Sequence, residues 1–318
     1  MAVRSLGQSV ESRQDTPSGD LVAFSPGMLS ALKLVHAFAP AIVPVILYGE
    51  TGSGKTLLAE YIHRLSARED GFHVFSVGIM TPQLALDELF GHVRGAFTDA
   101  HDTRAGRIAT AGSGTLLLDD LQNLDLSVQV QLLQVLDRGR YSPLGSERLV
   151  PVGCRVLFAM SGHPDELMRR GRLEPDLRYR FGECAVAVPP LRERRDEISV
   201  LAHRFLASCE RDTGVRGPTR LSDDVLRALE GGTYPGNVRQ LRGVMARAYL
   251  VAAAAGARAV RLEHLPEEWW PLEYRRGAAA ENRAAAERAL KEAGGNIRQA
   301  ARLLGVSRNT FKMVMAKE

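Results

Sequence analysis

Cysteine is scarce in this chain: the three present, Cys154, Cys184 and Cys209, stand apart from one another. No CxxC pair and no His/Cys cluster occurs in the sequence, so we expect neither a zinc site nor a disulfide scaffold. This usage fits the reducing cytosol, and we expect a cytoplasmic protein.

Long apolar runs are also lacking. The most apolar stretch, residues 34–48, is too short to cross a membrane and contains Pro40 and Pro44. The N-terminus has no apolar core of the kind found in a signal peptide. The 318 residues, 45% hydrophobic and 25% charged, therefore predict a globular protein of two domains or three small ones, with no membrane contact.

Net charge is absent from most of the chain. The sequence has 41 Lys+Arg and 37 Asp+Glu, a net charge of +4. Residues 279–318 contain eight basic and four acidic residues, so this segment accounts for the whole excess. A basic end on a neutral body indicates an anionic partner such as nucleic acid, although a solvated helical face would carry the same charges.

Short apolar runs alternate with helical patterns over the first part of the chain. The expected strands are residues 43–48, 73–77, 114–119, 155–160 and 185–188. Helices are expected to begin at Ser25-Pro26 and at Leu57. This alternation predicts an α/β domain with a parallel sheet, which we place at residues 21–190 after a polar tail of residues 1–20.

The pattern becomes wholly helical after Pro189-Pro190. Helical periodicity covers residues 196–211, 222–230 and 238–255, which predicts a smaller all-α domain at residues 191–272. Residues 273–282 are charged and rich in alanine, and we interpret them as a linker.

One Gly-rich motif has a clear chemical meaning. GETGSGKT matches G-x-x-x-x-G-K-[ST] at every fixed position, follows an apolar strand and opens a helix. Its residues are Gly49, Glu50, Thr51, Gly52, Ser53, Gly54, Lys55 and Thr56. In such a loop the backbone N–H groups face a polyphosphate, Lys55 reaches the β- and γ-phosphates, and Thr56 holds magnesium. The motif predicts ATP and magnesium as cofactors.

A second nucleotide element should be an apolar strand that ends in acidic residues. The run Leu116-Leu117-Leu118-Asp119-Asp120 has this form. Asp119 is expected to bind magnesium through water, and Asp120 to orient the attacking water.

Within residues 283–318, residues 283–316 predict three short helices, the third capped by Ser307 and continuing through Met315. The first is expected at residues 283–293 and the second at residues 297–304, with Ala300, Ala301, Leu303 and Leu304 as its apolar face. Two short helices joined by a Gly-containing turn indicate a helix-turn-helix, with a plain helical hairpin as the alternative. The expected DNA-contacting residues are Ser307, Arg308, Asn309, Thr310 and Lys312.

With these motifs in place, the sequence resembles the sigma-54-dependent transcription activators, or bacterial enhancer-binding proteins, from about Leu21 to the C-terminus. The stretches that carry the resemblance are LFGHVRGAFTDA (residues 89–100), GSGTLLLDDL (112–121), VPPLRERRDEI (188–198) and YPGNVRQLR (234–242). The C-terminal helices are similar to the Fis-type domain that ends this family.

The resemblance implies an AAA+ P-loop ATPase domain, an α-helical lid and a Fis-type domain. Lys55, Thr56 and Asp119 would bind ATP and magnesium, and Arg239 would contact the nucleotide from the lid. Arg180 would reach the ATP of a neighbouring subunit, since the family forms dimers and hexameric rings. An arginine supplied in this way stabilises charge that develops on the γ-phosphate.

The family resemblance also implies protein and DNA partners. The loop that touches sigma-54 would comprise Gly95, Ala96, Phe97, Thr98, Asp99 and Ala100, with Phe97 and Thr98 at its tip. Its target would be RNA polymerase with sigma-54, and the DNA would be an upstream activating sequence.

Several residues depart from the family pattern at positions for hydrolysis. The family's Asp-Glu pair is Asp119-Asp120, and Asp is one methylene shorter than Glu. A misplacement of about 1 Å can cost a hundredfold in rate. The family's asparagine that restrains this glutamate aligns with Ser76, and its Thr-Asn pair aligns with Met160-Ser161.

Two further departures concern partner contacts. The first of the family's two trans-acting arginines aligns with Glu174, although Arg172 or Arg178 could replace it. The fifth residue of the sigma-54 loop is Asp99 instead of glycine. Together these departures give the hypothesis that the protein binds ATP well and hydrolyses it slowly.

Three functions therefore stay open from sequence. The first is an ATP-driven activator of sigma-54 RNA polymerase; the second is a DNA-binding regulator whose assembly ATP controls with little turnover. The GAFT-type loop argues against the third, an AAA+ replication initiator or loader. Because only about twenty residues precede the ATPase domain, too few for a sensor domain, we expect control by a regulator acting in trans, by expression level or by nucleotide.

Overall fold

A computed structural model describes residues 21–66, 68, 70–78, 80–181, 184–269, 283–304, 311 and 315 of the chain. The chain divides into two compact units. The first comprises residues up to 204 together with 233–243, and the second comprises residues 205–232 and those from 244 onward. Within the described ranges, every helix is too short or too polar to traverse a bilayer.

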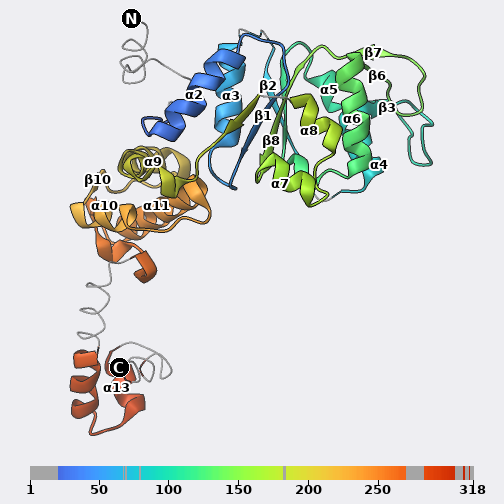
Figure 1. The fold of residues 1–318 in the computed structure, drawn as a ribbon. Helices are drawn as coiled ribbons and strands as arrows, with labels where there is room; N and C mark the ends of the chain where they lie inside the picture. The colour runs from blue at the N-terminus through green and yellow to red at the C-terminus, as the bar shows by residue number, and fades with distance from the viewer. Residues whose placement is uncertain are drawn as a thin grey trace, which may run out of the picture. The chain divides into compact units, whose positions relative to one another are not determined.

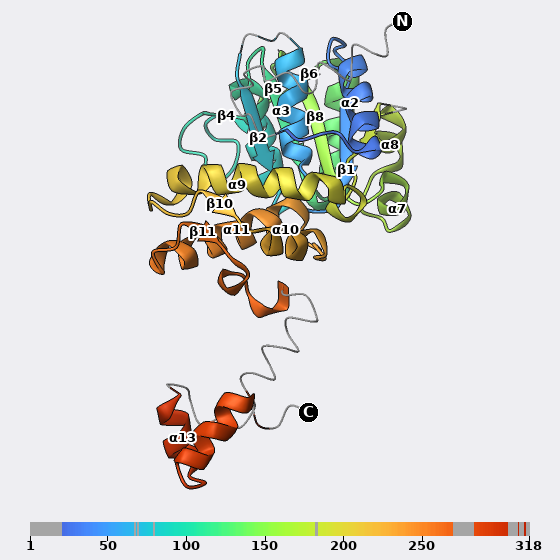
Figure 2. The same ribbon diagram turned by 90° about the vertical axis from the view of Figure 1, so that its left-hand side faces the viewer.

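The first unit is built on a five-stranded sheet in the order β2-β5-β8-β1-β9, with parallel neighbours throughout. Its strands are β1 (Val45–Gly49), β2 (Phe72–Ser76), β5 (Thr115–Asp119), β8 (Arg155–Ser161) and β9 (Ala185–Ala187). All five expected strands are present, and the predicted α/β class with a parallel sheet is confirmed. Figure 2 looks onto the sheet from the side that α3 crosses.

Helices cover both faces of this sheet (Figure 1). On one face lie α2 (Pro26–Phe38) and α3 (Lys55–Leu65). On the other lie α4 (Pro82–Phe90), α5 (Arg107–Thr110), α6 (Leu126–Arg138), α7 (Pro164–Arg169) and α8 (Pro175–Phe181). Short 3-10 turns complete the unit: η1 (Leu121–Asn123), η2 (Leu191–Glu193) and η3 (Arg195–Glu197).

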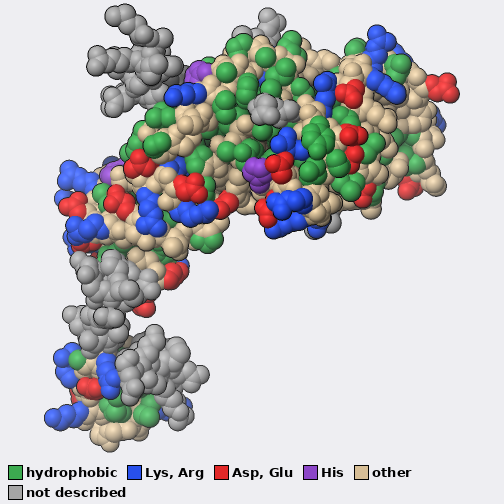
Figure 3. Space-filling model, in the orientation of Figure 1, with side chains coloured by type: hydrophobic (Ala, Val, Ile, Leu, Met, Phe, Trp, Pro, Cys, Tyr) green, Lys and Arg blue, Asp and Glu red, His purple; other side chains and the backbone are tan. Residues whose placement is uncertain are grey.

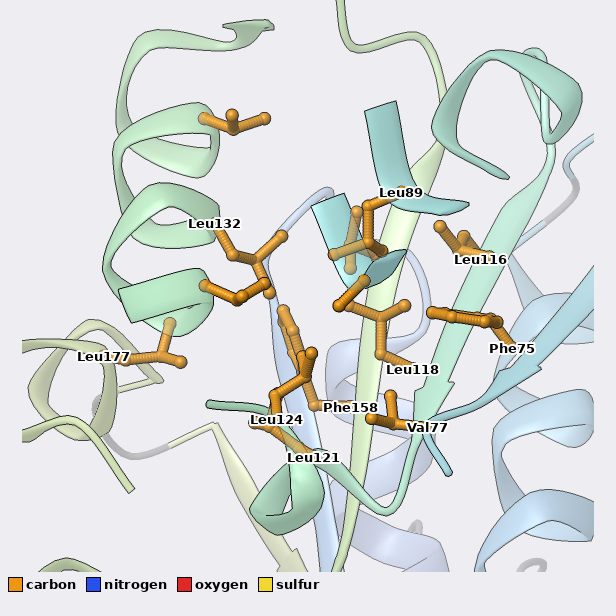
Figure 4. Packing of buried hydrophobic residues seen from close by; sticks show 14 of the residues in the cluster. Phe75, Val77, Leu89, Leu116, Leu118, Leu121, Leu124, Leu132, Phe158 and Leu177 are labelled. Carbon is orange, nitrogen blue, oxygen red and sulfur yellow. The ribbon is translucent and has the colours of Figure 1, made fainter. Parts of the chain in front are cut away.

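The two faces of the sheet have separate apolar cores because successive strand residues point to opposite sides. On β8, Phe158 and Met160 pack with α4, α6 and α8, whereas Leu157 and Ala159 pack with α2 and α3. Figure 4 shows the first of these cores, with Leu132 of α6 and Leu177 of α8 facing the sheet residues. Strands buried on both faces explain the continuous apolar runs in the sequence.

Local sequence explains where helices start. The Ser25 hydroxyl accepts a hydrogen bond from the N–H of Met28, and Pro26 occupies the first helical position of α2, as expected. Helix α3 starts at Lys55, two residues before the expected Leu57, because the phosphate-loop motif runs directly into it.

Two short hairpins interrupt the α/β pattern. One pairs β3 (Gly91–His92) with β4 (Arg104–Ala105), and the other pairs β6 (Arg140–Tyr141) with β7 (Val150–Pro151). Strands of two residues carry no periodic signal, so the sequence did not predict them. The face in Figure 3 shows basic and acidic side chains interspersed over this unit, in keeping with its balanced charge.

The second unit is mainly helical. Helix α9 (Ile198–Thr213) leads into it, followed by α10 (Asp223–Glu230) and α11 (Asn237–Ala254), of which residues 237–243 belong to the first unit. The turns η4 (Leu262–His264) and η5 (Glu267–Trp269) follow. The prediction of an all-α domain missed one parallel pair, β10 (Arg220–Leu221) with β11 (Ala259–Val260).

The C-terminal segment contains a helix over residues 283–292 and α13 (Ile297–Leu303), whose N-cap is Asn296. Ala300 and Ala301 of α13 are buried with Phe311, as expected for a small helical core. Leu303 and Leu304, which the sequence assigned to the same apolar face, are exposed in the single chain. The predicted tail, residues 1–20, and linker, residues 273–282, lie outside the described residues.

Candidate nucleotide-binding site

The predicted phosphate loop and acidic strand end meet at one edge of the sheet. Gly49 ends β1, Asp119 ends β5 and Ser161 ends β8, the strand that lies between them. Gly49 and Ser161 are direct partners in the β1–β8 register. Parallel strands end at the same edge, which is where open α/β sheets bind ligands.

The phosphate loop has the backbone that its glycines permit. Gly54 immediately precedes α3 with φ of 106°, and Gly52 has φ of 75°. A Cβ atom on Gly52 would lie 2.4 Å from the carbonyl oxygen of Gly236, so the loop packs backbone against backbone. Val238 confirms this contact, since its N–H donates to the carbonyl of Gly52 at 3.0 Å.

Lys55 occupies the centre of the loop and is buried. Its Nζ donates to the carbonyl oxygens of Gly49 and Glu50, both at 3.0 Å. Burial lowers the pKa of Lys55, and the positive charge of Arg239 acts in the same direction, whereas the carboxylates of Asp119 and Asp120 oppose it. A bound polyanion would add to the negative charge that the two carboxylates already provide near this buried ammonium group.

Thr56 and Asp119 form an oxygen pair next to the lysine. The Thr56 hydroxyl donates to Oδ2 of Asp119 at 3.1 Å, and Oδ1 of Asp119 accepts from the N–H of Asp120. Magnesium takes hard oxygen ligands and is commonly held by one or two protein oxygens plus substrate phosphates. The pair fits that role, and no group of three or more His, Cys, Asp or Glu suited to a metal occurs in the described part of the chain.

Asp120 lies close to the lysine but has an unusual backbone, with φ of 60° and ψ of 43°. Its Oδ1 accepts from Gln122 Nε2 at 3.0 Å and from the Ser161 hydroxyl at 3.2 Å. Met160, which aligns with the threonine of the family's Thr-Asn pair, is fully buried in the apolar core. Ser161 faces the site in its place, and its Oγ lies 3.4 Å from Lys55 Nζ.

Ser76, by contrast, has no hydrogen bond to Asp120 among those of the described residues. It ends β2 and pairs with Asp119 in the sheet register. Of the residues that the family resemblance singled out, Ser76, Met160 and Ser161, only Ser161 reaches the carboxylate of Asp120, and Gln122, which sequence reasoning did not select, joins it there.

Asn237 ties the phosphate loop to the start of α11. Its side chain is fully buried and its backbone has φ of 51°. Its Nδ2 donates to Oε2 of Glu50 and to the carbonyl of Thr51, and its Oδ1 accepts from the N–H of Leu191. Hydrogen bonds from Asn237 and then Arg192 lower the pKa of Glu50. Sequence reasoning selected neighbouring Arg239 and missed this asparagine.

A buried ion pair stabilises the phosphate loop. Arg194 and Glu197 are 4% and 0% exposed, and their side chains are joined by a hydrogen bond of 3.3 Å. Arg194 also donates to the carbonyl of Ser53, and Oε1 of Glu197 accepts from the N–H groups of Phe24 and Ser25. This network joins the phosphate loop to the start of α2.

The arginines expected to act on a neighbouring copy lie on or near α8. Arg180 is exposed and pairs with Asp137 of α6 at 2.9 Å. Arg178 pairs with Asp165 at 2.7 Å, and Arg172 is exposed. Glu174, at the position of the family's first arginine, immediately precedes α8 and receives a hydrogen bond on its carbonyl from the N–H of Arg178.

The expected sigma-54 loop connects β3 to β4. It is closed by a hydrogen bond from the N–H of Gly95 to the carbonyl of Ala100 at 2.9 Å, and Thr98 and Asp99 are exposed. Phe97 is 38% exposed, with its ring 4.9 Å from that of His92. Asp99 does not have a positive φ, so this position requires no glycine in the observed conformation.

The predicted DNA-contacting residues, Ser307, Arg308, Asn309, Thr310 and Lys312, lie outside the described residues.

Comparison with known proteins gives three consecutive family matches. A family described as "Sigma-54 interaction domain" matches residues 21–187, "AAA+ ATPase lid domain" matches residues 192–282, and "Bacterial regulatory protein, Fis family" matches residues 284–313. Together they follow the order of motifs in the sequence.

Curated relatives agree with these matches. The chain is 36% identical to the nitric oxide reductase transcription regulator NorR2 of Cupriavidus necator, over 91% of this chain and 61% of that protein. It is 31% identical to the DNA-binding transcriptional regulator NtrC of Klebsiella pneumoniae, over 93% of this chain and 70% of NtrC. The chain spans less than two thirds of the length of several relatives, including 37% of the Nif-specific regulatory protein of Azospirillum lipoferum.

Among solved structures, NtrX from Brucella abortus in complex with ATP superposes with a TM-score of 0.67 at 25% identity. The match covers 98% of this chain and 71% of that one.

Proposed function

The chain belongs to the sigma-54-dependent transcription activators, and from this premise we propose that it is an ATP-dependent regulator of transcription by RNA polymerase carrying sigma-54. The observation that carries the proposal is the convergence of Lys55, Thr56, Asp119 and Asp120 at the edge of a sheet whose unit also presents the GAFT-type loop.

Binding of ATP follows from the phosphate loop. The Lys55 ammonium group would exchange its two loop carbonyl acceptors for β- and γ-phosphate oxygens. Arg239, whose charge acts on Lys55, would add a second cation. Thr56 and Asp119 would hold magnesium, which when bound neutralises charge on the phosphates.

Hydrolysis would need an oriented water molecule, and the carboxylate of Asp120 would accept a hydrogen bond from it. The water oxygen would attack the γ-phosphorus, the bond from that phosphorus to the β–γ bridging oxygen would break, ADP would leave, and the proton lost by the water would pass to the carboxylate of Asp120. Arg180 of an adjacent copy would stabilise the charge on the transferring phosphoryl group, provided that it releases its exposed partner Asp137.

The partner contacts are proposed from the loop and the C-terminal helices. Phe97 and Thr98 would contact sigma-54 from the exposed loop between β3 and β4. The basic C-terminal segment would bind an upstream DNA element through Ser307, Arg308, Asn309, Thr310 and Lys312. Ring assembly would bring several loops to one polymerase.

The test is steady-state ATP turnover by the purified full chain over a range of protein concentrations, beside Lys55→Ala. We expect specific activity to rise with concentration and to vanish in Lys55→Ala. In vitro transcription from a sigma-54 promoter should then require hydrolysable ATP. Transcription that proceeds equally with Lys55→Ala would contradict the proposal.

A second function is favoured by one observation: the acid at position 120 is Asp, one methylene shorter than the family's Glu. Under this alternative the protein binds ATP and DNA, and nucleotide controls assembly with little hydrolysis. Background turnover in a wild-type chain that still binds ATP and DNA would select this second function.

A further inference from the structure

Asp120 is held in a conformation that few residues adopt. Its left-handed backbone costs free energy for any residue with a Cβ, and Asp and Asn tolerate it best. The turn directs Asp119 toward Thr56, whereas the carboxylate of Asp120 meets Gln122 and Ser161. The backbone conformation thus directs the two adjacent carboxylates toward different partners.

Gln122 and Ser161 form what we call the carboxylate clamp. Gln122 Nε2 donates to Oδ1 of Asp120 at 3.0 Å, and the Ser161 hydroxyl donates to the same oxygen at 3.2 Å. The clamp is closed by the N–H of Ser161, which donates to Oε1 of Gln122 at 3.1 Å. Both donors fall on Oδ1, which leaves Oδ2 as the oxygen that can accept a hydrogen bond from water.

The side chain at position 122 must donate and accept at once to close this ring of contacts. A primary amide does both, whereas an ionised carboxylate only accepts and a methionine donates nothing and accepts only weakly. Gln122 is in η1, directly after the acidic strand end, and Ser161 is the last residue of β8. The clamp therefore joins two adjacent strand ends around one carboxylate.

The clamp also contacts the phosphate loop. A hydroxyl group has one proton, and when Ser161 donates it to Asp120 its lone pairs face Lys55 Nζ at 3.4 Å and the Thr51 hydroxyl at 3.2 Å. The orientation of Asp120 is thereby connected through one side chain to the lysine expected to bind the γ-phosphate.

We propose that Gln122 and Ser161 are positioning residues that fix the carboxylate of Asp120 for ATP hydrolysis. A short carboxylate reaches the water in fewer orientations than a longer one, so restraint at Oδ1 compensates for the missing methylene. This inference rests on the proposed ATPase activity, and Gln122 acts in it only through Asp120.

The experiment uses the full chain and measures two quantities separately: the Kd of a fluorescent ATP analogue and the steady-state kcat. We expect Gln122→Ala and the near-isosteric Gln122→Met to lower kcat about tenfold while Kd stays within about twofold, because only the carboxylate is misplaced. Ser161→Ala should lower kcat, and Ser161→Thr, which keeps a hydroxyl, should retain it. The exposed Gln134 of α6 provides the matched control, Gln134→Ala.

A double-mutant cycle then identifies the route of the effect. In the Asp120→Asn background, Gln122→Ala should change kcat by less than about twofold, since no carboxylate remains to be positioned. The clamp is overturned if wild type shows Lys55-dependent turnover and both Gln122 variants keep the same kcat. It is also overturned if the losses of kcat caused by Asp120→Asn and by Gln122→Ala multiply in the double variant. Wild type that binds the analogue without Lys55-dependent turnover overturns the proposed ATPase itself, together with the clamp.

Discussion

Removal of the Glu197 carboxylate tests how the phosphate loop is supported. In the Glu197→Ala variant, Arg194 stays buried at 4% exposure without its ion-pair partner. The N–H groups of Phe24 and Ser25 lose their acceptor as well. Burial lowers the pKa of Arg194, whereas the charge and the hydrogen bond of Glu197 raise it.

The magnitude follows from burial on both sides of the pair. Breaking a buried ion pair by removing one partner costs about 3–5 kcal/mol, because an uncompensated charge remains. At about 2–4 °C per kcal/mol for a domain of this size, the Tm should fall by roughly 6–20 °C. Glu197→Gln, which keeps an oxygen acceptor for the two N–H groups, should lose less.

Thermal unfolding of the full chain, followed by circular dichroism without nucleotide, measures this loss. The matched control is Glu193→Ala, since Glu193 is 60% exposed and lies 3.7 Å from Arg192. An exposed pair of this kind contributes about 0–1 kcal/mol, so its Tm should stay within about 4 °C of wild type. A Glu197→Ala variant as stable as Glu193→Ala would refute the reasoning.

Three further predictions follow from contacts of the loops. Gly52→Ala places a Cβ 2.4 Å from the carbonyl oxygen of Gly236 at a residue with positive φ, so the affinity for a fluorescent ATP analogue should drop at least about tenfold. Gly243 has open space around it, and the control Gly243→Ala should leave this affinity unchanged. Equal affinities of the two variants would contradict the prediction. Because the folded-state pKa of Glu50 is lowered below 4.5, its stabilisation is present above that pH and is lost as the pH falls through the lowered pKa. The urea-midpoint gap between wild type and Glu50→Gln should therefore be largest near neutral pH and shrink below about pH 4.5, and a gap independent of pH would exclude this role. Phe97→Ala should abolish transcription by the sigma-54 polymerase with ATP turnover intact, as measured in one reaction mixture; full transcription would remove Phe97 from the contact.

The elements that depend on local pattern could be predicted from the sequence. The five strands are apolar throughout because helices cover both faces of the sheet, and this makes them visible as runs. Lys55, Thr56 and Asp119 belong to motifs with fixed spacing, and the fold brings them within hydrogen-bond range of one another or of their loop. The two hairpins are built from strands of two residues, which form no apolar run, so the sequence did not predict them.

The residues that sequence reasoning missed act through contacts between distant segments. Asn237 bonds to groups 186 and 187 residues away, and no local pattern encodes that pairing. Gln122 is conspicuous only once Asp120 is known to have a left-handed backbone. The Met160-Ser161 pair was interpreted by chemical type, whereas the strand's alternation decides which of the two faces the site.

The alternation of Met160 and Ser161 along β8 links the register of this strand to the composition of the proposed nucleotide site. A slip of β8 by one residue would move every side chain of the strand to the opposite face, so that Met160 would face the lysine and the acid and the Ser161 hydroxyl would enter the apolar core that Phe158 and Met160 now fill. The unsatisfied hydroxyl alone would cost such a misregistered sheet about 1–3 kcal/mol, and the proposed nucleotide site would lose Ser161. The proposed ATP turnover would therefore depend on the correct register of the central strand, which spectroscopic measures of helix content do not detect.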